Sequence, residues 1–191
     1  MFIQTQTTPN PATLKFLPGR DVSPATPYEF ISLEEAAASP LAAALFGING
    51  VRNVFLGSDF VAITKTEDAD WAVMKPQALA AIMDHFVSGA PVIADAAPPA
   101  ADEDDDVVYE GETAEIVAEI KELIATRVRP AVANDGGDIV FRRFDVETGI
   151  VHLSMRGACS GCPSSTMTLK QGVENLLRHY VPEVTAVEAA I

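Results

Sequence analysis

An acidic, proline-rich stretch at residues 89–108 divides the sequence into two parts. Alanine, proline and aspartate dominate it, and Pro98-Pro99 is followed by the acidic run 102–106. None of the 13 lysines and arginines of the chain falls within it. Proline stiffens such a segment and like charges extend it, so we expect a flexible linker. The flanking parts, residues 1–88 and 109–191, each have the length of one small domain.

The first part, residues 1–88, shows the pattern of a small α/β domain. Two short helices are expected behind the capping residues Ser32 and Ser39. A last helix is expected from near Pro76 to a stop at Gly89. The remaining apolar runs are bounded by turn residues and predict strands. These strands are expected at 2–7, 14–17, 28–31, 51–56 and 60–65, the last two forming a hairpin.

The second part, residues 109–191, is expected to fold in the order α-β-β-α-β. It opens with an amphipathic helix that we end at Pro130, because proline is unfavourable inside a helix. Two strands then form a hairpin, followed by a long helix and a short last strand. We place these elements at 139–146, 150–155, 163–180 and 183–187. The whole chain is therefore predicted to be of the α/β (α+β) class, with two small domains.

The chain has two cysteines, Cys159 and Cys162, and they lie together between a strand and a helix. The stretch reads Arg156-Gly157-Ala158-Cys159-Ser160-Gly161-Cys162-Pro163. Proline is favoured at the first helical position, which would make Cys162 the N-cap. A helix N-terminus carries partial positive charge and free N–H groups, and it favours thiolate over thiol. The pattern predicts a soft-metal or redox site.

Counting ligands indicates how such a site could be completed. Tetrahedral sulfur sites for zinc and iron–sulfur clusters take four ligands, and one chain supplies two. His179 would lie roughly 25 Å from Cys162 along the helix, and His85 belongs to the other domain. His152 could contribute only if its strand turned it toward the loop. A twofold pair of chains, each giving Cys159 and Cys162, would supply four sulfurs.

Other uses of the two thiols stay open at this point. A thioredoxin-like dithiol oxidoreductase would place Cys159 and Cys162 at a helix start, although here they stand late in the element order. A zinc-bridged structural dimer is a third option. Arg156 is close enough to offset the charge of a bound cluster, or it is a plain surface residue. We find no Ser–His–Asp set, nucleotide loop or paired carboxylates, so an enzyme is not expected.

Charge and hydropathy restrict partners and compartment. The formal net charge of −14 argues against nucleic acid or an anionic membrane, both of which need basic patches. The apolar runs are too short to span a bilayer, and no secretory signal is visible. Two cysteines so close would close only a tiny disulfide loop, which favours a reducing compartment. We expect a bacterial cytoplasm, or the mitochondrial matrix if a presequence has been removed.

Two sets of residues resemble one known family. The loop Asn134-Asp135-Gly136-Gly137-Asp138, followed by the cysteine stretch and Ser164-Ser165, resembles the C-terminal domain of Nfu (NifU-like) iron–sulfur scaffold proteins. The opening, with Thr8-Pro9-Asn10-Pro11 and Leu14-Lys15-Phe16-Leu17-Pro18-Gly19, resembles the N-terminal domain of the same family, as does Gly57-Ser58-Asp59-Phe60. The resemblance covers nearly the whole chain except the acidic linker.

This resemblance implies a carrier and not an enzyme. It implies that Cys159 and Cys162 bind the iron of a [4Fe–4S] cluster, with [2Fe–2S] as the alternative, shared with the same residues of a second chain. The implied partners are an upstream cluster-assembly scaffold, apo iron–sulfur client proteins and a second copy in a cluster-bridged homodimer. Neither nucleic acid nor a membrane is implied.

Overall fold

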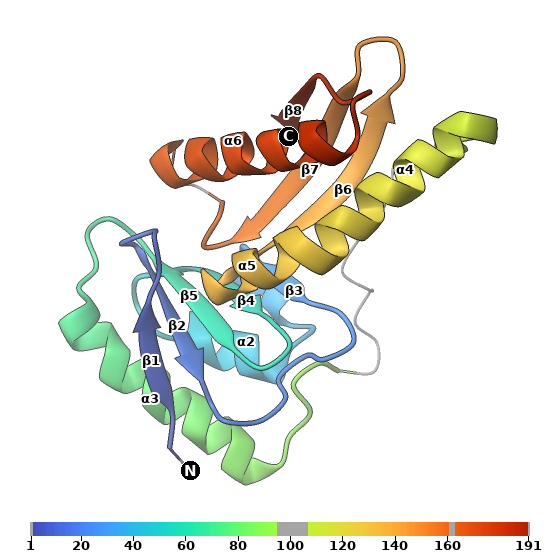
Figure 1. The fold of residues 1–191 in the computed structure, drawn as a ribbon. Helices are drawn as coiled ribbons and strands as arrows, with labels where there is room; N and C mark the ends of the chain where they lie inside the picture. Colours follow the sequence, from blue (N-terminus) through green and yellow to red (C-terminus); the bar gives the residue numbers. More distant parts are fainter. Residues whose placement is uncertain (1, 95–106, 161–162, 191) are drawn as a thin grey trace.

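The computed structural model describes residues 2–94, 107–160 and 163–190, which form two lobes that contact each other (Figure 1). We call residues 2–94 the N-lobe and residues 107–190 the C-lobe. Both mix helices with a sheet, so the predicted α+β class with two domains is confirmed. The predicted acidic linker falls mostly on residues 95–106, outside the described residues. No helix in the described part of the chain is long and apolar enough to cross a membrane.

The N-lobe is built on an antiparallel sheet in the order β1-β2-β5-β4-β3. Its helices α1 (Leu33–Ala36) and α2 (Pro40–Phe46) begin at side-chain caps from Ser32 and Ser39, as predicted. The strands lie within one or two residues of the predicted ranges. They are β1 Gln4–Thr7, β2 Thr13–Leu17, β3 Tyr28–Phe30, β4 Val51–Leu56 and β5 Val61–Lys65.

The long helix α3 (Trp71–Ser88) begins five residues before the predicted start. The Asp70 side chain accepts a hydrogen bond from the N–H of Ala72 and so caps the helix, while Pro76 stands inside it. The prediction of a start near Pro76 is therefore wrong, because a cap further upstream allows the proline to sit in the second turn. The predicted stop is confirmed at Gly89, whose φ of 72° is the left-handed end typical of glycine.

The two faces of the N-lobe sheet have different partners. Side chains alternate along a strand, so Val54 and Leu56 point to one face while Phe55 points to the other. The first face packs on α2 and α3 in the main core of the lobe. Phe55, Phe60 and Ala62 form a separate buried cluster with Ala133 of the C-lobe. The second face of the sheet is therefore the one that meets the C-lobe.

The C-lobe follows the predicted order, with an unexpected continuation of its first helix. After α4 (Gly111–Leu123) comes a π-helical turn, η1 (Ile124–Val128), and then α5 (Arg129–Asn134). The Arg129 N–H donates to the Ile124 carbonyl, the five-residue bond of a π turn. Pro130, predicted to end the helix, instead stands in the first turn of α5. Proline is tolerated in a first turn, because the N–H that it lacks is not needed there.

The sheet of the C-lobe has the order β6-β7-β8, with β7 antiparallel to β6 and parallel to β8. Helix α6 connects β7 to β8, and its Val173 and Leu177 are buried in the core of the lobe. Tyr180, the last residue of this helix, is exposed, and its hydroxyl accepts a hydrogen bond from Arg127. The elements are β6 Gly137–Asp145, β7 Ile150–Gly157, α6 Pro163–Tyr180 and β8 Ala186–Ala189.

Candidate cluster-binding site

The cysteine loop begins where β7 ends at Gly157 and leads toward α6 at Pro163. Its first turn is held by Ser160, whose N–H and hydroxyl both donate to the Gly157 carbonyl. The Thr166 hydroxyl donates to the carbonyl of Cys159 at 2.9 Å, which ties the loop to the first turns of α6. Cys162 and its predicted N-cap role lie outside the described residues.

Cys159 is buried, which the sequence reading did not expect of a loop thiol. It is 7% exposed and belongs to the apolar core of the C-lobe. Its sulfur lies against the backbone of Gly137, the first residue of β6. A Cβ placed on Gly137 would be 2.7 Å from the Cys159 Sγ and 2.6 Å from the Arg156 carbonyl oxygen. Glycine at this position therefore makes the room in which the sulfur sits.

The environment of Cys159 favours the protonated thiol. Burial, with a smaller contribution from the carboxylates of Asp135, Asp138 and Glu29, raises the pKa of Cys159 to about 12. The expectation that the loop favours thiolate is therefore wrong for Cys159 in this conformation. A metal ion or cluster would reverse this balance, because a bound thiol is deprotonated.

The N-lobe makes direct hydrogen bonds to the backbone of the cysteine loop. The Glu29 carboxylate accepts from the Gly157 N–H at 2.9 Å, and the same oxygen accepts from the Asn53 amide at 2.7 Å. The Asn10 amide donates to the Ala158 carbonyl at 3.3 Å. These contacts lie on the two residues directly before Cys159. No local pattern points to the role of Glu29, because Glu29 stands 128 positions away from its partner in the chain.

A second contact between the lobes lies at the end of α5. The Lys15 ammonium donates to the Ala133 carbonyl at 2.8 Å and lies over the Phe60 ring, 4.3 Å from its centroid. A cation suits the C-terminal end of a helix, where carbonyl groups lack helical partners. Lys15 is buried, and this burial lowers its pKa from the ordinary value. The contact thus combines a charge with the apolar cluster of Phe55 and Phe60.

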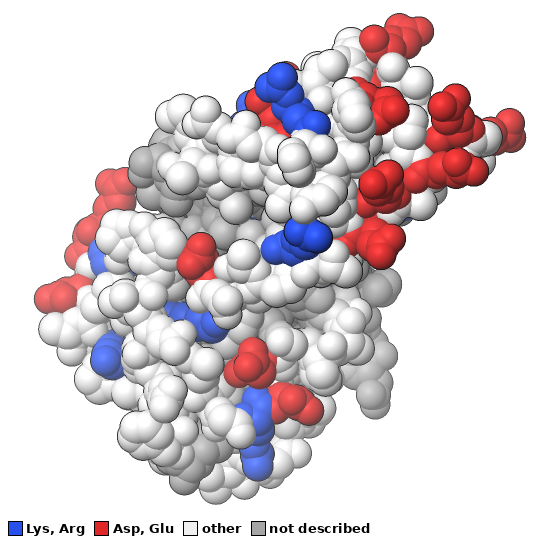
Figure 2. Space-filling view, viewed as in Figure 1, with Lys and Arg blue, Asp and Glu red and all other residues white. Residues whose placement is uncertain are grey.

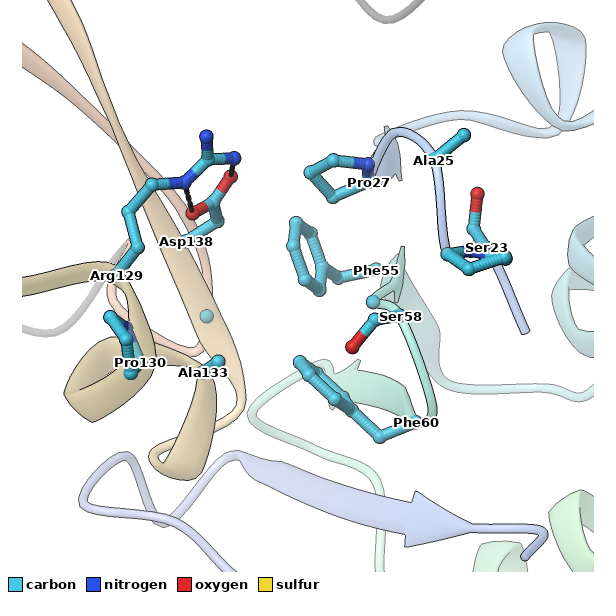
Figure 3. A pocket seen from close by; sticks show the side chains of 13 residues that line it. Ser23, Ala25, Pro27, Phe55, Ser58, Phe60, Arg129, Pro130, Ala133 and Asp138 are labelled. Carbon is cyan, nitrogen blue, oxygen red and sulfur yellow. Dashed lines mark hydrogen bonds and ion pairs between the residues drawn. The ribbon is translucent and has the colours of Figure 1, made fainter. Parts of the chain in front are cut away.

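A pocket of about 330 Å³ is lined by residues of both lobes (Figure 3). Phe55, Phe60 and Pro27 face it from the N-lobe. On the opposite side, the Arg129 guanidinium donates two hydrogen bonds, 2.8 and 2.7 Å long, to the buried Asp138 carboxylate. This bidentate pair joins the start of α5 to β6 and fixes the C-lobe wall of the pocket.

The other residues singled out in the sequence do not complete a metal site. Arg156 of β7 is buried and lies opposite Asp138 of β6. The interpretation of Arg156 as a plain surface residue is therefore wrong. His85 lies in the N-lobe core, and His179 stacks edge-on against Tyr180 at the far end of α6. The described residues contain no group of three or more His, Cys, Asp or Glu side chains arranged to hold a metal ion.

Exposed negative charge gathers along helix α4. Figure 2 shows acidic side chains along α4, at the upper right of the view. Exposed glutamates recur along this helix at positions 112, 115, 119 and 122. This face adds to the net charge of −14, which would oppose the association of two chains.

Known proteins show similarity to both lobes. The family model "Scaffold protein Nfu/NifU N terminal" matches residues 3–89, and the model "NifU-like domain" matches residues 120–188. The chain is 52% identical over 188 residues to NifU-like protein 4, mitochondrial, of Arabidopsis thaliana, covering 98% of this chain and 65% of that protein. It is 53% identical over 189 residues to the NFU1 iron-sulfur cluster scaffold homolog, mitochondrial, of Drosophila erecta, covering 98% of this chain and 64% of that one.

Among solved structures, a solution NMR structure of a NifU-like protein from Saccharomyces cerevisiae has a TM-score of 0.46 at 27% identity. It covers 50% of this chain and 86% of that one. The chain spans 65% and 64% of the length of the two curated relatives above.

Proposed function

Because the chain belongs to the Nfu (NifU-like) family of iron–sulfur cluster scaffold proteins, we propose that it carries a [4Fe–4S] cluster between two copies and delivers it to apo-proteins. The cluster is cargo, held by Cys159 and Cys162 of each chain. The observation that carries this proposal is the match of both lobes to one scaffold family, and in the structure Cys159 lies against Gly137.

Ligand counting supports sharing of the cluster. A cubane cluster takes four cysteine thiolates, and one chain contains two cysteines. The described part of the chain contains no separate group of three or more His, Cys, Asp or Glu side chains arranged to hold a metal ion. A second chain supplies the missing pair, and an isologous twofold contact places the same loop on both sides.

A shared site also suits delivery. Each cysteine of a client that replaces a carrier cysteine on an iron gives up one proton. The carrier thiolate that leaves takes up one proton, so charge and ligand number balance. In the metal-free chain, burial and nearby carboxylates raise the pKa of Cys159, so the sulfur that leaves the cluster is held there as the neutral thiol. We assign the role of carrier, with the upstream donor and the clients as its partners.

The alternative is a dithiol oxidoreductase that uses Cys159 and Cys162. An attacking thiol needs a large thiolate fraction at ambient pH, and the raised pKa of Cys159 gives the opposite.

The mitochondrial option for the compartment follows the names of the relatives, and it suits a reducing matrix that keeps both thiols free.

Anaerobic reconstitution of the purified full chain with iron and sulfide tests the proposal. We expect a brown protein with about two iron and two sulfide per chain, which transfers its cluster to an apo iron–sulfur enzyme and restores the activity of that enzyme. A colourless protein that binds only zinc would contradict the carrier role, as would one that reduces disulfides catalytically and takes up no iron.

A further inference from the structure

We propose that the N-lobe is a cap on the cysteine loop, closed in the metal-free chain and displaced when two chains share a cluster, with Asn10 and Glu29 as the residues that hold it closed. The inference rests on the proposed function and adds a role for the N-lobe. Its basis is the geometry of the contact between the lobes.

The first step is that the N-lobe binds the loop itself. Gly157 and Ala158, the two residues before Cys159, each make a hydrogen bond to an N-lobe side chain, from Glu29 and Asn10 respectively. The fit extends to the backbone. A Cβ on Gly157 would be 3.0 Å from Phe55 Cγ, and one on Gly136 would be 3.2 Å from Thr8 Cγ2. Glycines at these positions let the lobes approach this closely.

The second step is that other N-lobe groups hold Glu29 and Asn10 in the orientation that the contact needs. The Asn53 amide donates to the same Glu29 oxygen that accepts from the Gly157 N–H. A group of the N-lobe itself therefore orients the carboxylate toward Gly157. Asn10 is 5% exposed, and its own Oδ1 accepts from the Ala12 N–H in the turn between β1 and β2. That turn leaves the Asn10 amide N–H groups pointing at the Ala158 carbonyl. Burying a polar side chain without a hydrogen-bond partner costs free energy. Asn10 and Glu29 therefore favour the arrangement in which Ala158 and Gly157 supply their partners.

The third step is competition for one surface. A cluster ligated by Cys159 and Cys162 of two chains requires the two loops to face each other across it. In the described conformation Asn10, Glu29 and Phe55 occupy the side of the loop formed by residues 157 and 158. The cap and the second chain therefore compete, and loading must break the contacts of Asn10 and Glu29.

The variant Asn10→Asp tests the cap by replacing the side-chain amide with a carboxylate of the same shape. The carboxylate keeps the acceptor for Ala12 N–H, so the local turn is preserved, but it places an oxygen against the Ala158 carbonyl oxygen. Asn49→Asp is the matched control, since Asn49 is exposed in the loop between α2 and β4. Lys15→Met is a second, independent opening variant. It keeps an apolar stem over Phe60 and removes the donor to Ala133.

Two rates are measured on the full chain. The first is modification of Cys159 by N-ethylmaleimide in the metal-free, reduced protein, followed by peptide mass spectrometry. We expect Asn10→Asp and Lys15→Met to raise this rate roughly three- to tenfold, the size of one lost hydrogen bond, and Asn49→Asp to leave it unchanged. The second is the rate of cluster uptake from iron and sulfide, which we expect to rise in the same two variants. Trp71 fluorescence checks that each N-lobe remains folded.

The direction in which the labelling rate and the rate of cluster uptake change decides whether the proposal holds. Labelling rates equal to wild type in both opening variants would overturn the cap. Slower or reduced cluster uptake would also overturn it, because it would mean that the N-lobe supports the loaded loop. If no variant and no wild-type protein takes up iron, the proposed function fails. The maleimide rates then still show whether the N-lobe closes the loop.

Discussion

At the residue scale, Cys159 combines a place in the apolar core of the C-lobe with its proposed role as a cluster ligand. We predict that Cys159→Ser and Cys162→Ser both abolish stable cluster binding, since each removes two of four ligands from a shared site. Cys159→Ser should also lower the free energy of unfolding by about 1–3 kcal/mol, because it places a hydroxyl in the apolar core of the C-lobe.

Cys159→Ala is the matched control for this effect. It should recover part of the stability lost in Cys159→Ser, since it returns an apolar side chain to the core, and it should still bind no cluster. Iron and sulfide analysis and urea unfolding make the two measurements. A Cys159→Ser protein with full iron content would contradict the assignment of the ligand.

Gly137 gives a second prediction at this scale. Gly137→Ala places a methyl group 2.7 Å from the Cys159 sulfur, so the start of β6 must shift at a cost of about 1–3 kcal/mol. We expect lower stability and less iron per chain. Gly172→Ala is the control, because its Cβ meets nothing within 4 Å and a helix gains about 0.5–1 kcal/mol from alanine. Equal effects of the two variants would disprove the packing role of Gly137.

At the element scale, local rules predicted most helices and strands but failed at two prolines. Ser32, Ser39 and Gly89 mark helix ends through groups next to them in sequence, so they could be identified from the chain alone. By the same rules Pro76 predicts a helix start and Pro130 a helix end, but both prolines lie inside helices. The actual boundary of α3 depends on the Asp70 cap, and the continuation past Pro130 depends on a π turn.

The site was predictable only in part for a related reason. The CxxC pattern located the thiols, because that signal lies within four residues. The burial of Cys159 depends on Gly137, which stands across the β6–β7 pair and far from it in sequence. The contact of Glu29 with Gly157 joins residues from different lobes. Neither feature has a local pattern in the sequence.

Helix α3 should be sensitive to acid. His85 is buried, its Nε2 has no hydrogen-bond partner among the described residues, and desolvation lowers its pKa below the ordinary value of 6.5. A lowered folded-state pKa means that the unfolded chain binds the proton more tightly. The stability contribution is therefore present above pH 6.5 and is lost as the pH falls through the folded-state pKa. Thermal unfolding followed by Trp71 fluorescence should show a lower midpoint at pH 5.5 than at pH 7.5.

The variant His85→Leu provides the control, because leucine fills a similar apolar space without titrating. Its midpoint should change less between the two pH values than that of the wild type. An identical pH dependence in both proteins would show that another group causes the acid sensitivity of the N-lobe.

At the scale of the whole molecule, the acidic, proline-rich composition of residues 89–108 predicts a linker between two separately folded domains. Limited proteolysis of the full chain should cut within this range and leave two stable fragments. Elastase suits the alanine-rich sequence, and the fragment ends can be read by mass spectrometry. Uniform resistance across residues 89–108 would contradict the prediction, and so would cuts spread through both lobes.

The sharing of one cluster by two chains is the central claim, and mass and iron content measured on the same sample test it most directly. The full chain is examined by light scattering and iron analysis when loaded, and again after chelation. We predict a dimer with about four irons per two chains, which returns to a metal-free monomer when the cluster is removed, because the complete site exists only in the dimer. Salt should favour the dimer by screening the acidic surfaces. A loaded monomer with four irons per chain would contradict the claim.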